Sequence, residues 1–150
     1  MSRTLVAREK DTLKLPVENV WAVVSAFGAV KTWIPTIGGT TVTGQGIGAV
    51  RSVEFLGNVL QEKLEVSDAD SHTVSYRIID SDALPFKGGY GSVALEPVDD
   101  KTTAITWSCD AEEVDADGIQ AVSGTLSVFI KSAIQGLKDA LYREVQPLGV

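Results

Sequence analysis

Between residues 37 and 113 the hydrophobic pattern of the chain has a period of two, and this feature constrains the fold more than any other. Such a period is typical of strands that bury one face. Turn-forming glycine, asparagine and aspartate residues divide the stretch into short segments. We therefore expect an antiparallel meander of six strands, at 38–44, 48–56, 59–67, 73–80, 91–98 and 102–113.

Helical patterns lie on both sides of this meander. After a further strand at 3–10, the segment LPVENVWAVVSAFG has apolar residues at helical spacing, with Gly28 as its expected stop, and AVKTWIP predicts a second short helix that ends before Pro35. From about Asp117 to Glu144 one apolar face persists, which predicts a helix of about 40 Å. Gly124 and Gly136 interrupt this helix. We expect them to allow close packing, with a hinge as the alternative.

The order of these elements predicts an α+β fold. A curved, antiparallel, seven-stranded sheet would wrap around the long C-terminal helix, with two short helices after the first strand. The 150 residues contain no linker or internal repeat, so we expect a single domain over residues 1–150. A strongly curved sheet that is closed by one helix leaves a cavity between the two.

Composition excludes several classes of function. The net charge of −7 argues against nucleic acid and against anionic membrane surfaces. No apolar run is long enough for a membrane span, and the N-terminal residues lack a signal sequence. One cysteine, Cys109, rules out an internal disulfide, so we expect a cytoplasmic protein. One histidine, His72, is expected in a solvent-exposed turn, and no ligand pair predicts a metal or other cofactor.

Two charges interrupt the apolar faces of neighbouring strands. In VRSVEFLGNVLQEKLEV, Arg51 and Glu62 occupy positions that alternation assigns to the inner face. A two-residue turn at Gly57 and Asn58 makes them diagonal neighbours, within reach of each other. That register pairs Leu56 with Val59, Val53 with Glu62, and Arg51 with Leu64.

Three interpretations of this pair remain open. The two charges could form a buried pair with a purely structural role, although apolar replacements often stabilise a core as well. A register error of one residue would turn both side chains outward. Alternatively, they form the polar centre of an apolar pocket, where they orient a carbonyl, carboxylate or enolate and move protons. We adopt the third interpretation.

Alternation and helical spacing extend the predicted ligand site. Tyr76 is expected beside Leu64 and close to Arg51, and Asp80 has the same parity at the strand end. Trp33 and Tyr90 are expected at the mouth of the cavity, and each aromatic could instead serve core packing. The predicted ligand-binding residues are Trp33, Val53, Phe55, Leu64, Tyr76, Ile78, Phe86, Tyr90, Trp107, Phe129, Ile130 and Ala133. Cys109 is expected to be a buried, unreactive thiol.

Four segments carry a resemblance to a known superfamily: WAVVSAFGAVKTWIP, GIGAVRSV, LQEKLEVSD and VSYRIIDSDALPF. Over essentially its whole length the chain resembles the SRPBCC superfamily of helix-grip proteins, which includes START domains, the major birch pollen allergen and polyketide cyclases. It is most similar to the polyketide cyclase/dehydrase branch, to which the lachrymatory factor synthases belong. In those synthases an arginine after the glycine turn and a glutamate on the next strand form the acid–base pair. The resemblance implies that Arg51 stabilises an oxyanion and that Glu62 transfers a proton.

These observations predict a protein that binds a small apolar or aromatic ligand in an internal cavity. Arg51 and Glu62 would perform cofactor-free acid–base chemistry of the cyclase, dehydratase or isomerase type. The alternative is a non-catalytic carrier or sensor whose gate is the glycine-rich segment SDALPFKGGYG, residues 81–91. A third alternative is an accessory protein that acts through a partner. The sequence leaves the identity of the ligand and the oligomeric state open.

Overall fold

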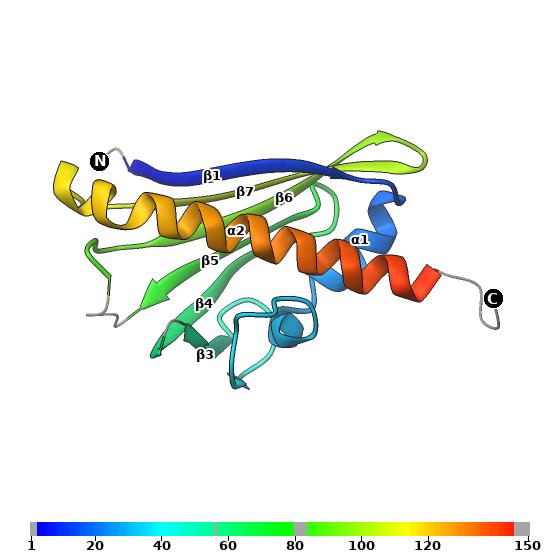
Figure 1. The fold of residues 1–150 in the computed structure, drawn as a ribbon. Helices are drawn as coiled ribbons and strands as arrows, with labels where there is room; N and C mark the ends of the chain where they lie inside the picture. Colours follow the sequence, from blue (N-terminus) through cyan, green and yellow to red (C-terminus); the bar gives the residue numbers. More distant parts are fainter. Residues whose placement is uncertain (1–2, 56, 80–83, 146–150) are drawn as a thin grey trace.

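The computed structural model describes residues 3–55, 57–79 and 84–145. Its seven strands form one antiparallel sheet in the order β1-β7-β6-β5-β4-β3-β2, and the long helix α2 runs across one face of this sheet (Figure 1). The curved sheet and the C-terminal helix confirm the predicted helix-grip fold. In chain order the elements are β1 (Thr4–Leu13), α1 (Val17–Val24), the 3-10 helix η1 (Phe27–Thr32), β2 (Thr40–Thr43), β3 (Val50–Phe55), β4 (Asn58–Asp68), β5 (Thr73–Ile79), β6 (Tyr90–Asp99), β7 (Thr102–Ala111) and α2 (Ala116–Val145).

The first helical region differs from its prediction. The helix expected over residues 15–28 ends at Val24, and η1 begins three residues later. Gly28 is therefore not a helix stop but a point of close approach to β2. A Cβ atom on Gly28 would lie 2.7 Å from Val42 Cγ2, which is shorter than van der Waals contact. The absence of a side chain at Gly28 thus lets η1 pack against the edge of the sheet.

The core fills the space between the sheet and α2. The buried residues of α2 recur at spacings of three and four, which is the pattern of a helix with one face buried. They pack against inward-facing strand residues such as Leu13 and Ile105, which are fully buried. The buried apolar residues of α2 are Leu126, Ile130, Ala133, Ile134, Leu137 and Leu141.

The two glycines of α2 have different surroundings. A Cβ atom on Gly136 would collide with the carbonyl of Trp33 and would lie 2.9 Å from Pro35 Cδ, so close packing explains this glycine as predicted. Gly124 is the opposite case, because no atom lies within 4 Å of the position its Cβ would occupy. Close packing therefore does not explain Gly124.

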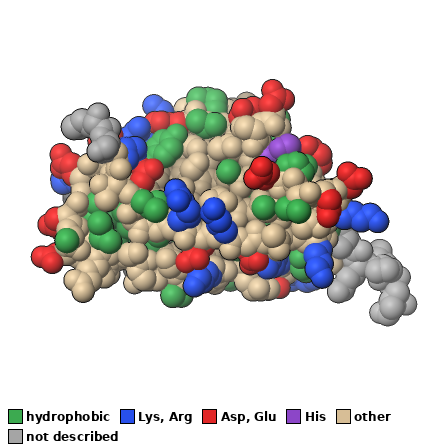
Figure 2. All heavy atoms as spheres, turned by 90° about the horizontal axis from the view of Figure 1, so that it is seen from above, with side chains coloured by type: hydrophobic (Ala, Val, Ile, Leu, Met, Phe, Trp, Pro, Cys, Tyr) green, Lys and Arg blue, Asp and Glu red, His purple; other side chains and the backbone are tan. Residues whose placement is uncertain are grey.

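Charged side chains cover the outside of the fold. Acidic and basic groups are interspersed on the face shown in Figure 2. Lys138 Nζ lies 2.7 Å from Asp11 Oδ2, and Lys131 Nζ lies 3.7 Å from Glu9 Oε1, so ion pairs connect α2 to β1. Among the described residues, no helix has the length and apolarity that crossing a membrane requires.

Candidate functional site: an ion pair in an apolar pocket

The hairpin between β3 and β4 brings Arg51 and Glu62 directly opposite each other. Its last pair is Phe55 with Asn58, and Gly57 has a φ of 80°, a conformation that favours glycine. The predicted register is wrong by two residues, since Arg51 faces Glu62 rather than Leu64 and Val53 faces Leu60 rather than Glu62. Leu56 lies outside the described residues. Because strand side chains alternate with a period of two, this shift leaves both charges on the inner face.

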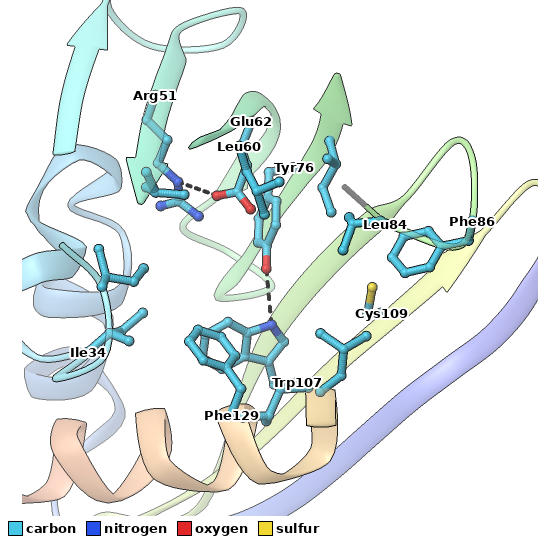
Figure 3. A pocket seen from close by; sticks show the side chains of 15 residues that line it. Ile34, Arg51, Leu60, Glu62, Tyr76, Leu84, Phe86, Trp107, Cys109 and Phe129 are labelled. Carbon is cyan, nitrogen blue, oxygen red and sulfur yellow. Dashed lines mark hydrogen bonds and ion pairs between the residues drawn. The ribbon is translucent and has the colours of Figure 1, made fainter. Parts of the chain in front are cut away.

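The two charged side chains form a buried ion pair (Figure 3). Arg51 Nε donates a hydrogen bond of 2.7 Å to Glu62 Oε1, and the two side chains are 8% and 10% exposed. Arg51 Nη1 also donates to the backbone carbonyl of Phe27 at 2.8 Å. The guanidinium lies 4.1 Å from the ring centroid of Phe27 and 4.9 Å from that of Tyr76. These contacts exclude the interpretation in which both charges face solvent.

Tyr76 places a hydroxyl beside this pair. It pairs with Leu64 as predicted, and its oxygen accepts a hydrogen bond of 3.2 Å from Trp107 Nε1. Burial raises the pKa of Tyr76 far above its ordinary value, and the negative charge of Glu62 raises it further. The hydroxyl therefore stays protonated at neutral pH. Since Trp107 occupies one of the lone pairs of this oxygen, the hydroxyl proton can be donated to a ligand.

A pocket opens at the ion pair between the sheet and α2 (Figure 3). Its volume is about 60 Å³. For comparison, one water molecule needs about 10–15 Å³, and an engineered cavity of about 150 Å³ binds benzene. An aromatic ligand therefore requires at least one lining side chain to move. The lining residues are Ile34, Ile37, Arg51, Val53, Leu60, Glu62, Tyr76, Ile78, Leu84, Phe86, Trp107, Cys109, Leu126, Phe129 and Ile130.

Apart from Tyr90, the predicted ligand-binding residues divide into three groups. Val53, Tyr76, Ile78, Phe86, Trp107, Phe129 and Ile130 line the pocket together with the two charges. Trp33, Leu64 and Ala133 are buried in the core but do not belong to the pocket wall. Phe55 ends β3, and its side chain lies outside the described part of the structure.

Tyr90 is not at the mouth of the cavity. It is the first residue of β6 and alternates with the buried Gly91 and Val93, so its ring lies on the outer face of the sheet. There it lies between two guanidinium groups, 5.3 Å from Arg3 and 5.5 Å from Arg77. The sequence prediction had assigned Tyr90 to a loop, where alternation carries no information.

The structure adds six lining residues to those predicted. Three of them had a periodic signal, because Leu60 has the parity of Glu62, Cys109 has that of Trp107, and Leu126 lies on the apolar face of the long helix. The other three, Ile34, Ile37 and Leu84, come from irregular segments that have no such signal.

Cys109 is an unreactive thiol at neutral pH. Burial raises its pKa to about 12, and the negative charges of Asp110 and Glu62 act in the same direction. A nucleophilic cysteine requires the thiolate form. The expectation of a buried cysteine is confirmed, and its raised pKa supports the expectation that the thiol is unreactive.

The glycine-rich segment before β6 supports the pocket wall. A Cβ atom on Gly91 would collide with the Tyr76 ring, and one on Gly89 would lie 2.7 Å from Phe86 Cε2 and 3.0 Å from Ile78 Cδ1. These two glycines let both aromatic rings pack directly onto the backbone.

Backbone hydrogen bonds hold this segment on both sides. Lys87 N donates to the Glu113 carbonyl at 2.9 Å, and Ile78 N donates to the Gly89 carbonyl at 2.9 Å. These bonds hold residues 87–89 in place, and Asp80 and residues 81–83 lie outside the described residues, so the gate stays a prediction.

His72 occupies the predicted turn but is not freely solvated. Its φ is 52°, its Nε2 lies 2.7 Å from Glu18 Oε1, and its side chain is 13% exposed. The ring packs edge-on against Trp21 with centroids 5.7 Å apart. Helix α1 lies over this turn and covers the imidazole. The prediction of a solvent-exposed His72 side chain is therefore wrong. No group of three metal-binding side chains occurs among the residues that the structure describes.

Comparisons with known proteins agree with this architecture. No curated protein matches the chain in sequence. A solution structure from Thermobifida fusca has 19% identity and a TM-score of 0.80, with 97% of each chain covered. Protein XoxI from Bacillus cereus also has 19% identity and a TM-score of 0.80, over 98% of this chain and 100% of that one.

A third similar structure is norcoclaurine synthase from Thalictrum flavum in complex with dopamine and hydroxybenzaldehyde. It has 15% identity and a TM-score of 0.77, over 97% of this chain and 90% of that one. At these identities the three structures show the shared fold alone. The family model described as polyketide cyclase / dehydrase and lipid transport matches residues 4–146. The chain therefore belongs to the polyketide cyclase/dehydrase and lipid transport family, within the SRPBCC superfamily.

Proposed function

We propose that this protein performs cofactor-free acid–base chemistry on a small apolar or aromatic carbonyl compound held in the pocket. The observation that carries the proposal is the buried ion pair of Arg51 and Glu62 in a wall that is otherwise mostly apolar. Burying two charges is unfavourable, and apolar residues of similar volume often stabilise a core equally well. A pair retained at the wall of a pocket therefore favours a role in chemistry.

Glu62 is the proposed base. Its Oε1 accepts the hydrogen bond from Arg51, and its second oxygen, Oε2, is the atom proposed to take the proton. Oε2 would remove a proton from the carbon next to the carbonyl of the substrate. The C–H electron pair would form a C=C bond, and the π pair of the carbonyl would move onto its oxygen to give an enolate. In a β,γ-unsaturated substrate the enolate is a dienolate, and return of the proton from Glu62 to its γ carbon completes an isomerisation. In a β-hydroxy substrate the enolate expels the hydroxyl group, which takes the proton from Glu62 and leaves as water, and this completes a dehydration.

Tyr76 and Arg51 would stabilise the enolate oxygen. Tyr76 offers a neutral O–H donor whose orientation is set by the Trp107 N–H. Arg51 supplies a positive charge that its contacts with Phe27 and Tyr76 hold in place. Donors that are already oriented where negative charge develops need no reorganisation during the reaction, and this preorganisation is a major source of catalysis.

A small aromatic substrate is compatible with this fold. The structure of norcoclaurine synthase, with its TM-score of 0.77, contains dopamine and hydroxybenzaldehyde. For our chain that complex supports the general class of ligand and no particular compound.

The alternative function is that of a carrier or sensor with no turnover. One observation favours it: the ion pair is already satisfied internally, because Arg51 bonds both to Glu62 and to the Phe27 carbonyl without any ligand. In a carrier the same pair would only orient the ligand, so replacement of Glu62 by glutamine would change affinity and nothing else.

Hydrogen–deuterium exchange separates the two functions. Phenylacetone in D₂O would be incubated with the wild type, Glu62→Gln, Tyr76→Phe and the control Glu96→Gln, which changes an exposed glutamate of β6. NMR would follow loss of the C–H signal next to the carbonyl, and calorimetry would follow binding. We expect the wild type and the control to accelerate exchange, and Glu62→Gln to lose about 100-fold or more. Binding without accelerated exchange would identify a carrier, and undiminished exchange in Glu62→Gln would exclude Glu62 as the base.

A further inference from the structure

One side chain, Phe129 of α2, borders two separate spaces. Toward the interior it lines the pocket and contacts Trp107 edge to face, with ring centroids 6.0 Å apart and an interplanar angle of 74° (Figure 3). Toward the exterior it lines an open groove of about 380 Å³. The other residues of this groove are Thr36, Gly124, Thr125, Val128 and Ser132.

We infer that pocket and groove are two parts of one ligand site and that Phe129 is the residue that divides them. The ligand would be a single amphipathic molecule, with a small carbonyl- or hydroxyl-bearing head at Tyr76 and an extended tail that passes Phe129 into the groove. This inference rests on the proposed function only in taking the pocket as a ligand site, and it does not require turnover.

The volumes favour a shared site. The pocket has room for only a few water molecules, and an aromatic head group needs a larger volume. Most of the lining residues are buried, whereas Phe129, Ile78 and Leu84 are half-buried. Of these three, Phe129 also lines the groove. A rotation of Phe129 toward the groove would enlarge the pocket and join it to the outside in one step.

The opposite side of the pocket is less suited to admit a ligand. Residues 87–89 are held there by backbone hydrogen bonds to Ile78 of β5 and to Glu112 and Glu113. Gly89 and Gly91 lie directly against the aromatic rings that form that wall, so a shift of the segment would disturb Phe86 and Tyr76.

Gly124 supplies a second, independent observation. Glycine is unfavourable within a helix relative to alanine, and no packing contact explains it here, because no atom lies within 4 Å of its missing Cβ. Because Gly124 has no side chain, the groove stays open. A larger residue at this position would project into the groove. An open groove on the outer side of Phe129 is what a ligand tail requires.

The composition of the groove indicates the chemistry of the tail. Val128 is 69% exposed and offers an apolar contact beside Phe129. Thr36, Thr125 and Ser132 contribute hydroxyl groups that can donate to or accept from a polar terminus. An aliphatic tail with a hydroxyl, ether or carbonyl end would match this lining. Among the described residues that line the groove, none is a lysine or arginine that could pair with an anionic end.

A series of 4-alkylphenols, from 4-methylphenol to 4-octylphenol, tests the inference by calorimetry. In the wild type the dissociation constant should keep falling as the tail lengthens, by about three- to four-fold for each methylene that enters the groove. Gly124→Leu fills the groove and is compatible with a helix. We expect it to bind the short phenols like the wild type and to bind the longest about ten-fold or more weakly. Gln120→Leu, which places the same leucine side chain on α2 outside the groove lining, should behave like the wild type.

Phe129→Ala removes the divider and should strengthen binding of the long phenols, provided that its thermal unfolding remains cooperative. If Phe129→Ala does not fold, the Gly124→Leu comparison still decides the question. Unchanged affinity of Gly124→Leu for the longest phenol would overturn the inference, as would an affinity of the wild type that stops rising at the shortest tails, or no binding of any phenol. Length-dependent binding without deuterium exchange would leave the inference intact and refute the proposed catalysis alone.

Discussion

Replacing the buried ion pair with apolar residues distinguishes a stabilising role from a chemical one. The variants are Arg51→Met, Glu62→Leu and the double variant, which together form a thermodynamic cycle. At an effective dielectric constant of about 20, two charges roughly 3 Å apart attract each other by about 5 kcal/mol. Removing each ion from water opposes this attraction by several kcal/mol. The net contribution of the pair to the free energy of unfolding should therefore be close to zero.

The single variants should behave very differently from the double variant. Each one leaves a buried charge without its partner, which typically destabilises a protein by about 3–5 kcal/mol. Arg51→Met should be the worse of the two, because it also removes the hydrogen bond to Phe27 and the two ring contacts. The double variant removes both charges at once. We expect it to lie within about 2 kcal/mol of the wild type.

Urea unfolding, followed by circular dichroism at pH 7, measures these differences. A double variant that loses as much stability as the two single variants together would refute the reasoning, because the charges would then contribute independently. A double variant that is stable and still binds ligand, but no longer accelerates deuterium exchange, would assign the pair to chemistry. Val53→Ala, at the same pocket wall, is the control for a general loss of packing. Its effect on the free energy of unfolding should simply add to the effect of either charge variant.

Three further predictions follow from individual contacts. Gly91→Ala should shift the Tyr76 ring and destabilise the fold by about 1–3 kcal/mol, with a matching change in near-ultraviolet circular dichroism; an unperturbed spectrum would contradict the contact. Thr103→Val should cost about 1–2 kcal/mol in urea unfolding, since the Leu15 carbonyl loses its 2.8 Å hydrogen bond, and a neutral result would count against this. Above pH 9 the unfolded chain releases the Cys109 proton while the folded chain retains it to about pH 12, so stability should fall as the pH rises. Cys109→Ala should reduce that slope by up to about 1.4 kcal/mol per pH unit, and an unchanged slope would refute the assignment.

Alternation predicted faces more reliably than registers. The turn after β3 was placed one position too late, and the partner of Arg51 was displaced by two residues. Both Arg51 and Glu62 were nevertheless assigned to the correct face, because a displacement by two preserves the side of the sheet. A register displaced by one residue would have placed them on the solvent-facing side. The assigned face therefore depended on whether the register shift was even or odd, and not on its size.

Irregular segments limited the prediction of the site. Ile34 and Ile37 follow η1, where no strand or helix period relates their side chains to the pocket. Tyr90 was assigned to a loop, although it begins β6 and faces outward. The surroundings of Gly124 could not be predicted from sequence, because a glycine within a helix gives the same pattern whether it packs closely or leaves a space open.

The strand order also determines when the sheet can be completed during synthesis. β1 pairs with β7 alone, at the edge of the sheet, and even its nearest pair, Leu13 with Thr103, joins residues about ninety positions apart. At roughly 5–20 residues per second, β1 leaves the ribosome several seconds before its partner strand is made. During that interval the strand has unpaired backbone groups and no sheet to join. A chaperone that binds β1 in the nascent chain would shorten the time for which this edge is exposed to other chains.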